Sequence, residues 1–230
     1  MDVSYNCELN LSTDLEPTSF KEATSHDEWN EAMQKEYDAL INNGTWKLVD
    51  PPLGTKPIGC KWVYKNKYKA DGSLDKHKAR LVAKGFAQKE GVDNEEIFAP
   101  TAKWATIWTL FALAAQKGWK VHQKDVKNAF LNKDLKEKVF MSQPEGFVVK
   151  GQEHKVCKLV KSLHGLKQAP RAWHEKLLEH LMKHNFKNFD LDDATLFVKK
   201  VGKTVVYIAV YVDDLLMIGN NESYIASIKK

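Results

Sequence analysis

The sequence predicts an α+β fold, on the basis of three observations. The 230 residues are 43% hydrophobic and 28% charged, a composition typical of a globular chain with one large domain or two small ones. Segments with the two-residue alternation of a strand are interleaved with segments that have the spacing of an amphipathic helix. These segments show neither an internal repeat nor a regular alternation of strand and helix. This irregular order favours the α+β class.

The N-terminal part is predicted to be a tail followed by a helix. Residues 1–21 lack hydrophobic periodicity, so we assign them to a tail or linker and residues 22–230 to the folded domain. Ser25 and Glu28 have the spacing of a capping box, and Asn42-Asn43-Gly44 is typical of a helix end. Apolar residues at helical spacing lie between them: Trp29, Met33, Tyr37 and Leu40.

A short strand, Thr45–Val49, is followed by a predicted β-ribbon. In Cys60–Tyr68 apolar and basic residues approximately alternate, Asp71-Gly72 marks a turn, and Lys78–Phe86 is typical of a return strand. Since alternate strand residues share a face, we expect aromatic side chains on one face and Lys and Arg on the other.

The second half of the chain alternates between helices and strands. In chain order we expect a largely buried helix (Lys103–Lys117), a short strand (Lys120–Asp125), a long amphipathic helix (Leu166–Phe186), a hairpin around Gly202 (Thr195–Val198 and Thr204–Val212) and a last apolar strand (Leu215–Ile218). Pro170 suits the first turn of the long helix, and Trp173 is expected to anchor that helix in the core.

The composition excludes secreted and membrane-spanning classes. The longest uninterrupted apolar run, Val205–Val212, has only eight residues, and the first twenty residues lack a basic start followed by an apolar stretch. Cys7, Cys60 and Cys157 lie far apart and match no metal-ligand spacing, so they are expected to be reduced thiols. We therefore expect an intracellular protein with no membrane partner, in the cytoplasm or the nucleus.

The net charge of +5 hides a strong asymmetry. Residues 1–55 contain eleven Asp/Glu and three Lys/Arg, a balance of −8, whereas residues 56–89 contain ten Lys/Arg and two Asp, a balance of +8. A basic block inside an otherwise ordinary domain indicates a polyanionic partner such as nucleic acid. The alternative is a lysine-rich hairpin whose charges are simply solvated.

Two consecutive carboxylates, Asp213 and Asp214, separate the apolar runs Val205–Val212 and Leu215–Ile218. Tight hairpins favour Asn-Gly or Gly-X in such a position, because positive φ angles are needed there. Two like charges on a buried hairpin are costly unless a cation is present, and a hard divalent ion that takes oxygen ligands is suited to the site. The alternative is an exposed turn in which both aspartates meet water.

Asp125 has a similar setting at the end of the predicted strand Lys120–Asp125. It could be only the N-cap of a following helix. If both strand ends meet in one sheet, however, three carboxylates share a site, as expected for two Mg²⁺ ions about 4 Å apart in phosphoryl transfer.

A series of motifs, in this order, resembles the reverse transcriptase of Ty1/copia-type LTR retrotransposons. The likeness spans roughly residues 22–230. The motifs are NGTWKLV (43–49), KWVYK (61–65), KARLVAKGFAQ (78–88), FAP (98–100), DVKNAFL (125–131), QPEGF (143–147), GLKQAPRAW (165–173) and YVDD (211–214).

The resemblance implies a right-hand polymerase fold, with fingers formed by residues 58–88 and most of the palm. Asp125 would bind both metal ions, Val126 would offer its carbonyl oxygen, Asp213 would be the second shared ligand and Asp214 a weaker one. The implied cofactor is Mg²⁺, with Mn²⁺ able to replace it. The implied partners are an RNA or DNA template with its primer and deoxynucleoside triphosphates.

The resemblance also suggests how the substrate is bound. Phe130 would lie beneath the sugar and exclude a 2′-hydroxyl, although ordinary packing is its alternative role. The basic residues Lys78, Arg80 and Lys84 would hold the triphosphate or the template backbone, or serve only solubility. His164 would lie near the nucleotide pocket, and Gly165 would permit close backbone approach to the new base pair.

The chain departs from the family at three positions. His164 stands where Tyr is usual, Lys133 where Gly tolerates a positive φ, and Trp108 where Arg is usual. The sequence also ends at Lys230 without counterparts of a thumb and an RNase H domain, which we expect in a parent polyprotein. We therefore expect the chain alone to be inactive, with Leu215–Ile218 exposed.

Two other functions remain open from the sequence. One is a catalytically silent retroelement remnant that binds nucleic acid weakly through its basic ribbon. The other is a metal-dependent nuclease, which uses similar carboxylates but does not explain the ribbon or the loop at Gly165.

Overall fold

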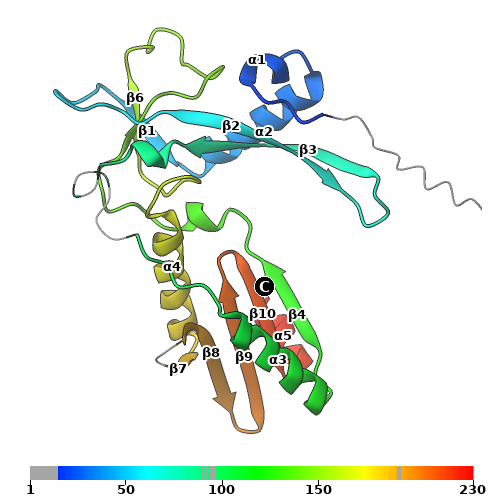
Figure 1. Cartoon of the computed structure of the whole chain (residues 1–230). Helices are drawn as coiled ribbons and strands as arrows, with labels where there is room; N and C mark the ends of the chain where they lie inside the picture. The colour runs from blue at the N-terminus through cyan, green and yellow to red at the C-terminus, as the bar shows by residue number, and fades with distance from the viewer. Residues whose placement is uncertain (1–14, 90, 92, 94–96, 191–192, 230) are drawn as a thin grey trace, which may run out of the picture.

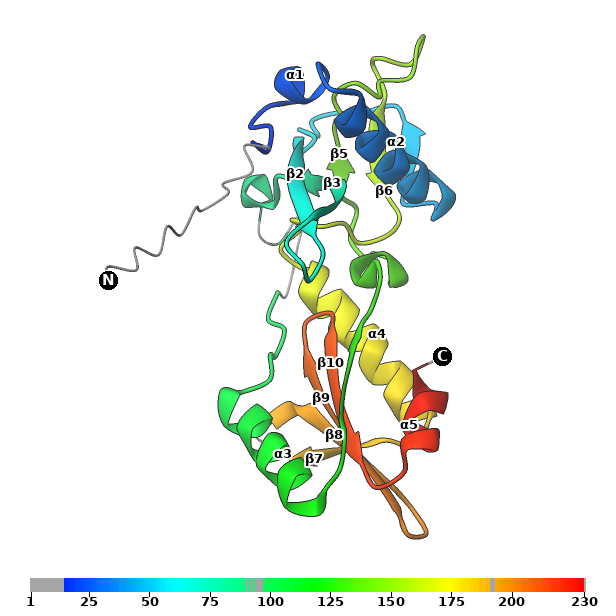
Figure 2. The same cartoon turned by 90° about the vertical axis from the view of Figure 1, so that its right-hand side faces the viewer.

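The computed structural model describes residues 15–89, 91, 93, 97–190 and 193–229, so residues 1–14 of the expected tail lie outside the described residues. The described chain mixes helices and strands, as predicted, and forms two lobes (Figures 1 and 2). The ribbon lobe contains α1 (Phe20–Ala23), α2 (Asp27–Asn42), β1 (Trp46–Val49), β2 (Cys60–Tyr68), β3 (Leu74–Ala83), β5 (Phe140–Met141) and β6 (Val156–Leu159). The sheet lobe contains the remaining helices and strands.

The predicted β-ribbon is present in the ribbon lobe. β2 and β3 pair antiparallel from Cys60↔Ala83 to Tyr68↔Leu74. Trp62 and Leu81, which are cross-strand partners, are buried on the face that carries the hydrophobic core with α2. The opposite face of the ribbon therefore lies outside the hydrophobic core.

A three-stranded sheet in the order β1-β6-β5 supports the base of the ribbon. The structure confirms β1, whereas β5 and β6 were not predicted. β5 has two residues and β6 has four, so neither is long enough to show a period-two pattern of its own.

The sheet lobe is built on a five-stranded antiparallel sheet in the order β4-β10-β9-β8-β7. The strands are β4 (Val121–Asp125), β7 (Lys187–Asp190), β8 (Asp193–Val201), β9 (Thr204–Tyr211) and β10 (Asp214–Gly219). The predicted hairpins around Gly202 and around the aspartate pair are the centre of this sheet. β7 was not predicted.

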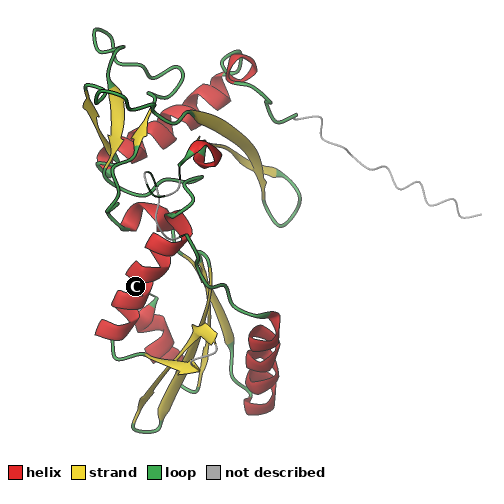
Figure 3. Cartoon of the chain, turned by 60° about the vertical axis from the view of Figure 1, so that its left-hand side comes forward, coloured by secondary structure: helices red, strands yellow, loops and turns green. Residues whose placement is uncertain are grey.

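Helices cover both faces of the five-stranded sheet (Figure 3). α4 (Ala169–Lys183) and α5 (Glu222–Ile228) pack on one face, where Ile208 of β9 is buried. α3 (Trp104–Lys117) packs on the other face, against Ala209. Successive residues of β9 thus serve two separate cores. Among the described residues, no helix combines the length and apolar character that crossing a bilayer requires.

Three local expectations are wrong. α3 is not largely buried, because only Leu110 and Ala114 are buried within it, while Trp108 is 64% exposed. The run Leu215–Ile218 is not exposed, because it lies between β9 and β4 and beneath helices on both faces. Ser25 does not cap α2, because its hydroxyl donates to the carbonyl of Glu22 at 2.6 Å and so closes α1 instead.

Candidate functional site

The β9–β10 turn contains only one of the two consecutive aspartates. Tyr211 pairs with Asp214, so Val212 and Asp213 form the two-residue turn. Asp214 is the first residue of β10. The expectation that both aspartates occupy the turn is therefore wrong. The backbone of Asp213 belongs to the turn, whereas that of Asp214 is paired in the sheet.

Strand pairing brings Asp125 to the same point. Asp125, the last residue of β4, is the cross-strand partner of Asp214, and the N–H of Val126 donates to the carbonyl of Asp213 at 2.9 Å. Paired residues lie on the same face of a sheet, here the α3 face that also carries Gln123. The side-chain amide of Gln123 donates to the Asp214 carboxylate at 2.9 Å.

The backbone of the turn is strained. Val212 has a φ of +55°, which is unfavourable for a β-branched residue. The buried side chain of Trp173, on α4, donates from Nε1 to the carbonyl of Val212 at 2.7 Å. Trp173 anchors the core as expected, and it also holds the turn. The sequence contains no signal for that hydrogen bond, since the two residues lie far apart along the chain.

Asp125 is not a helix N-cap. The next helical segment is the 3₁₀ helix η2 (Ala129–Asn132), and its N-cap is Asn128. Asp125 itself is exposed, and Asp213 and Asp214 are half-buried. The N-cap alternative is therefore wrong, and no helix start accounts for this carboxylate.

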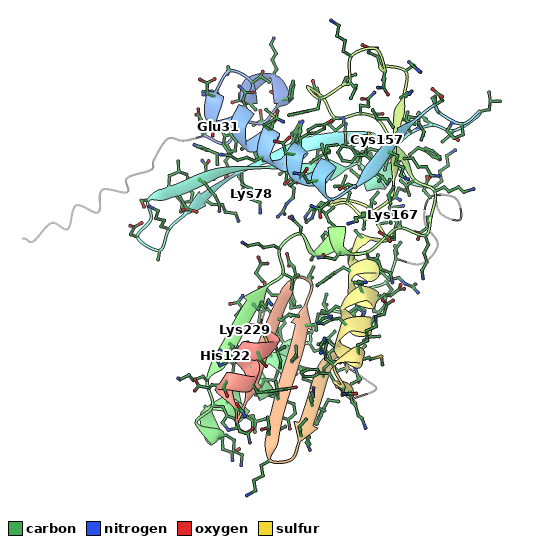
Figure 4. All side chains as sticks on the ribbon, turned by 180° about the vertical axis from the view of Figure 1, so that it is seen from behind. Glu31, Lys78, His122, Cys157, Lys167 and Lys229 are labelled. Carbon is green, nitrogen blue, oxygen red and sulfur yellow. The ribbon has the colours of Figure 1, made fainter. Side chains whose placement is uncertain are left out.

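The free face of the ribbon is basic. Lys78 and Arg80 alternate with the buried Ala79 and Leu81, and the cross-strand partner of Lys78 is Lys65. Figure 4 places Lys78 on the side of the ribbon turned toward the sheet lobe. Burial, followed by the charge of Arg80, lowers the pKa of Lys78. Positive charges are thus concentrated on one surface, with the Glu36 carboxylate of α2 close to Lys78 and Arg80.

Lys84 lies at the base of this basic face. It follows the end of β3, its N–H donates to the carbonyl of Gly59 at 2.8 Å, and its side chain lies against Gly59. The backbone contact fixes Lys84 next to the start of β2. Of the three basic residues predicted from the sequence, Lys78 and Arg80 therefore lie on β3 and Lys84 immediately follows it.

His164 and Phe130 form a pair of rings near the basic face. Their centroids lie 4.7 Å apart at an interplanar angle of 79°, an edge-to-face arrangement. Burial, followed by the charges of Arg80 and Lys78, lowers the pKa of His164 to about 4. His164 is therefore neutral at pH 7. Phe130, on η2, packs against the cores of both lobes.

The loop that carries His164 is docked tightly on the end of β3. The N–H of Ala83 donates to the carbonyl of His164 at 2.8 Å. A Cβ on Gly165, whose φ is +89°, would lie 2.2 Å from the carbonyl oxygen of Ala83, and a Cβ on Gly85 would lie 2.0 Å from that of Gly165. Only glycine fits at either position, because each approaches backbone that cannot yield.

Two buried glutamines, which sequence reasoning missed, join the end of the ribbon to the start of α4. Gln88 donates from Nε2 to the side-chain oxygen of Gln168 at 3.0 Å and accepts from the N–H of Lys167 at 2.9 Å. The side chain of Gln168 also donates to the carbonyl of Asp93 at 2.9 Å. Both glutamines lie within motifs recognised from the sequence, but their pairing across the fold has no local signal.

Comparison with known proteins identifies the family. Residues 43–230 match the family described as reverse transcriptase (RNA-dependent DNA polymerase). The chain belongs to this family. The predicted Ty1/copia-type reverse transcriptase is thus confirmed at the level of the family and its relatives.

Relatives that match over most of the chain include transposon polyproteins. It is 46% identical over 222 residues to the retrovirus-related Pol polyprotein from transposon TNT 1-94 of Nicotiana tabacum, covering 95% of this chain and 17% of that protein. It is 44% identical over 218 residues to the corresponding polyprotein from transposon RE1 of Arabidopsis thaliana, covering 94% and 15%. Identity to the transposon Ty1-NL2 Gag-Pol polyprotein of Saccharomyces cerevisiae is 27%, covering 91% and 12%. The chain spans less than a fifth of each of these three polyproteins.

Reverse transcriptases use divalent metal ions, and this chain offers oxygen donors of the type that a hard ion takes. Carboxylate oxygens of Asp125 and Asp213, with a peptide carbonyl at Val126, are the ligand type that Mg²⁺ prefers. Among the residues that the structure describes, however, no three His, Cys, Asp or Glu side chains are gathered closely enough to hold an ion. The strands converge, but the carboxylates do not form the compact cluster expected from the sequence.

The surroundings of each residue that departs from the family pattern accommodate it. Lys133 has an extended backbone with φ −123°, so it needs no positive φ, and its ammonium lies 2.7 Å from Glu179. The positive φ that a glycine would tolerate at position 133 is therefore not adopted by Lys133. Trp108 is exposed on α3, and His164 packs edge-on against Phe130.

Proposed function

We propose that residues 22–230 form the nucleotide-adding part of a Ty1/copia-type reverse transcriptase. Residues 1–21 precede this part, and the last two of them, Phe20 and Lys21, begin α1. The ribbon lobe corresponds to fingers and the sheet lobe to most of the palm. The observation that carries this proposal is the pairing of Asp125 with Asp214 beside the Val212–Asp213 turn, with a basic ribbon face turned toward the same lobe.

The aspartates hold the metal ions in this proposal. Asp125 and Asp213 would be the shared ligands of the Mg²⁺ ions, which Mn²⁺ could replace, Val126 would contribute its carbonyl oxygen, and Asp214 would be a weaker ligand. Bound ions would acidify the primer hydroxyl and neutralise phosphate charge. The hydrogen bond from Gln123 occupies part of the Asp214 carboxylate, which supports the weaker role of that residue.

The remaining residues bind and orient the substrates, a deoxynucleoside triphosphate and a primer on an RNA or DNA template. Lys78, Arg80 and Lys84 hold the triphosphate or the template backbone. Phe130 excludes a 2′-hydroxyl, and the edge contact of His164 fixes the orientation of that ring. A thumb and an RNase H domain in a parent polyprotein complete the enzyme.

A chimera tests the proposed activity. Residues 43–230 replace the matching segment of the tobacco TNT 1-94 polyprotein, and primer extension on a defined RNA template is measured with Mg²⁺. We expect template-directed synthesis that Asp125→Asn and Asp213→Asn each reduce by at least about 10³-fold, since oriented ion ligands supply much of the rate. Asp50→Asn, an exposed carboxylate of the ribbon lobe, is the matched control.

Two outcomes contradict the proposal. Synthesis that survives Asp125→Asn would exclude that residue as a metal ligand. Folded chimera that binds primer–template but extends nothing, under conditions in which the tobacco protein extends it, would favour the silent nucleic-acid-binding remnant.

A further inference from the structure

The C-terminal end of α4 carries two histidines one helical turn apart. The ring centroids of His180 and His184 lie 4.5 Å apart at an angle of 50°, and both residues are exposed. Residues at i and i+4 share one helix face, so both imidazoles can direct a nitrogen to a common point in front of that face.

A cavity of about 330 Å³ adjoins both rings. It lies between the end of α4 and α5, which run beside each other (Figure 2). Tyr224 and Ser227 line it from α5, and the Ser227 hydroxyl donates to the carbonyl of Tyr224 at 2.7 Å. The cavity has room for one ion with several bound waters, since a water occupies about 30 Å³ in the liquid.

Two electrostatic effects at this end of α4 have opposite influences on a bound cation. The C-terminal end of a helix is the negative pole of its dipole and stabilises a cation. Burial, followed by the charges of His184, Lys176, Lys183 and Lys124, lowers the pKa of His180. A lowered pKa favours the neutral imidazole, which is the form that binds a metal, while the lysines keep the affinity modest.

We propose that His180 and His184 form a two-imidazole site for a divalent transition ion of the Zn²⁺ type, with water and α5 hydroxyl groups completing its shell. Imidazole suits Zn²⁺, Cu²⁺ and Ni²⁺, whereas Mg²⁺ takes oxygen ligands. The site is therefore chemically distinct from the aspartates and independent of the proposed polymerase. The ion holds the end of α4 against α5.

Calorimetric titration of the untagged chain with Zn²⁺, in buffer that contains millimolar Mg²⁺, tests the site. We expect one saturable ion per chain, bound at least about tenfold more weakly by His180→Gln and by His184→Gln. The matched control is His154→Gln, an exposed histidine of the ribbon lobe, which keeps the wild-type affinity. Asp125→Asn keeps it as well, which separates this site from the proposed catalytic one.

A second measurement guards against variants that fold poorly. Zn²⁺ raises the melting temperature of the wild-type chain, because it binds only the folded α4–α5 pair, and it leaves the melting temperature of His184→Gln unchanged. The proposal is overturned if no saturable binding occurs, if both glutamine variants bind like the wild type, or if His154→Gln removes the binding.

Discussion

The hairpins β2–β3 and β9–β10 make their turns in opposite ways. In β2–β3 the chain turns at Asp71-Gly72, where glycine takes the positive φ of +83° and the Asp71 carboxylate accepts from the N–H of Ser73 at 2.9 Å. In β9–β10 the positive φ falls on Val212, although a branched side chain disfavours it.

The difference shows what fixes each turn. The residues of the β2–β3 turn favour its conformation by themselves, so this turn requires no contacts with the rest of the molecule. The β9–β10 turn costs about 1–2 kcal/mol in backbone strain, and it is kept by the Trp173 hydrogen bond and by the pairing with β4. The strain lies next to Asp213, where the proposed function requires a carboxylate in a fixed place.

Trp173→Ala is expected to have the largest effect on stability. Removing this buried ring leaves a cavity in the α4 core and frees the carbonyl of Val212, so we expect the free energy of unfolding to fall by about 3–5 kcal/mol. Trp173→Phe keeps most of the packing and loses only the hydrogen bond, a change of about 1 kcal/mol or slightly more. Urea denaturation measures both, and a Trp173→Phe variant as stable as the wild type would show that the hydrogen bond contributes nothing.

Charge also separates the two hairpins, and salt dependence tests the basic one. Joint replacement of Lys78, Arg80 and Lys84 by Ala should reduce the slope of log affinity against log salt for a primer–template duplex by up to about 2.7, or about 0.9 for each lost phosphate contact. The matched control replaces three exposed lysines of the sheet lobe: Lys187, Lys200 and Lys203. An unchanged slope in the first variant would mean that its three residues are simply solvated.

Exchanging the turn residues tests the contrast directly. Gly72→Val has space for its side chain but must keep a positive φ, so we expect a loss of about 1–2 kcal/mol. Val212→Gly removes a similar strain and adds about 0.5–1 kcal/mol of chain entropy, so no net loss is expected. Thermal unfolding of both variants gives the signs. A loss above about 2 kcal/mol in Val212→Gly would contradict strain at this turn.

Asp125→Asn should have the smallest effect on stability. Asp125 and Asp214 are paired like charges, so the variant should gain about 0.2–1 kcal/mol in Mg²⁺-free buffer. Added Mg²⁺ should raise the melting temperature of the wild type more than that of the variant. Asp75→Asn, an exposed carboxylate of the ribbon, serves as control. Equal responses to Mg²⁺ in all three chains would argue against an ion at Asp125.

The sequence by itself determined most of the strands and helices, because their signals are local. Alternation in Cys60–Tyr68 specified the ribbon and its basic face, and helical spacing specified α2 and α4. The reverse transcriptase family was also readable, since its motifs survive in order. Short strands such as β5 were missed because two residues carry no periodicity.

Only the tertiary structure decided how the site is held together. It placed Asp213 in the turn and Asp214 in the strand, paired Asp214 with Asp125, and aimed Trp173 at the carbonyl of Val212. It also joined Gln88 to Gln168 across the fold. These contacts link residues far apart along the chain, and each depends on the packing of whole strands and helices, which no local pattern of residues encodes.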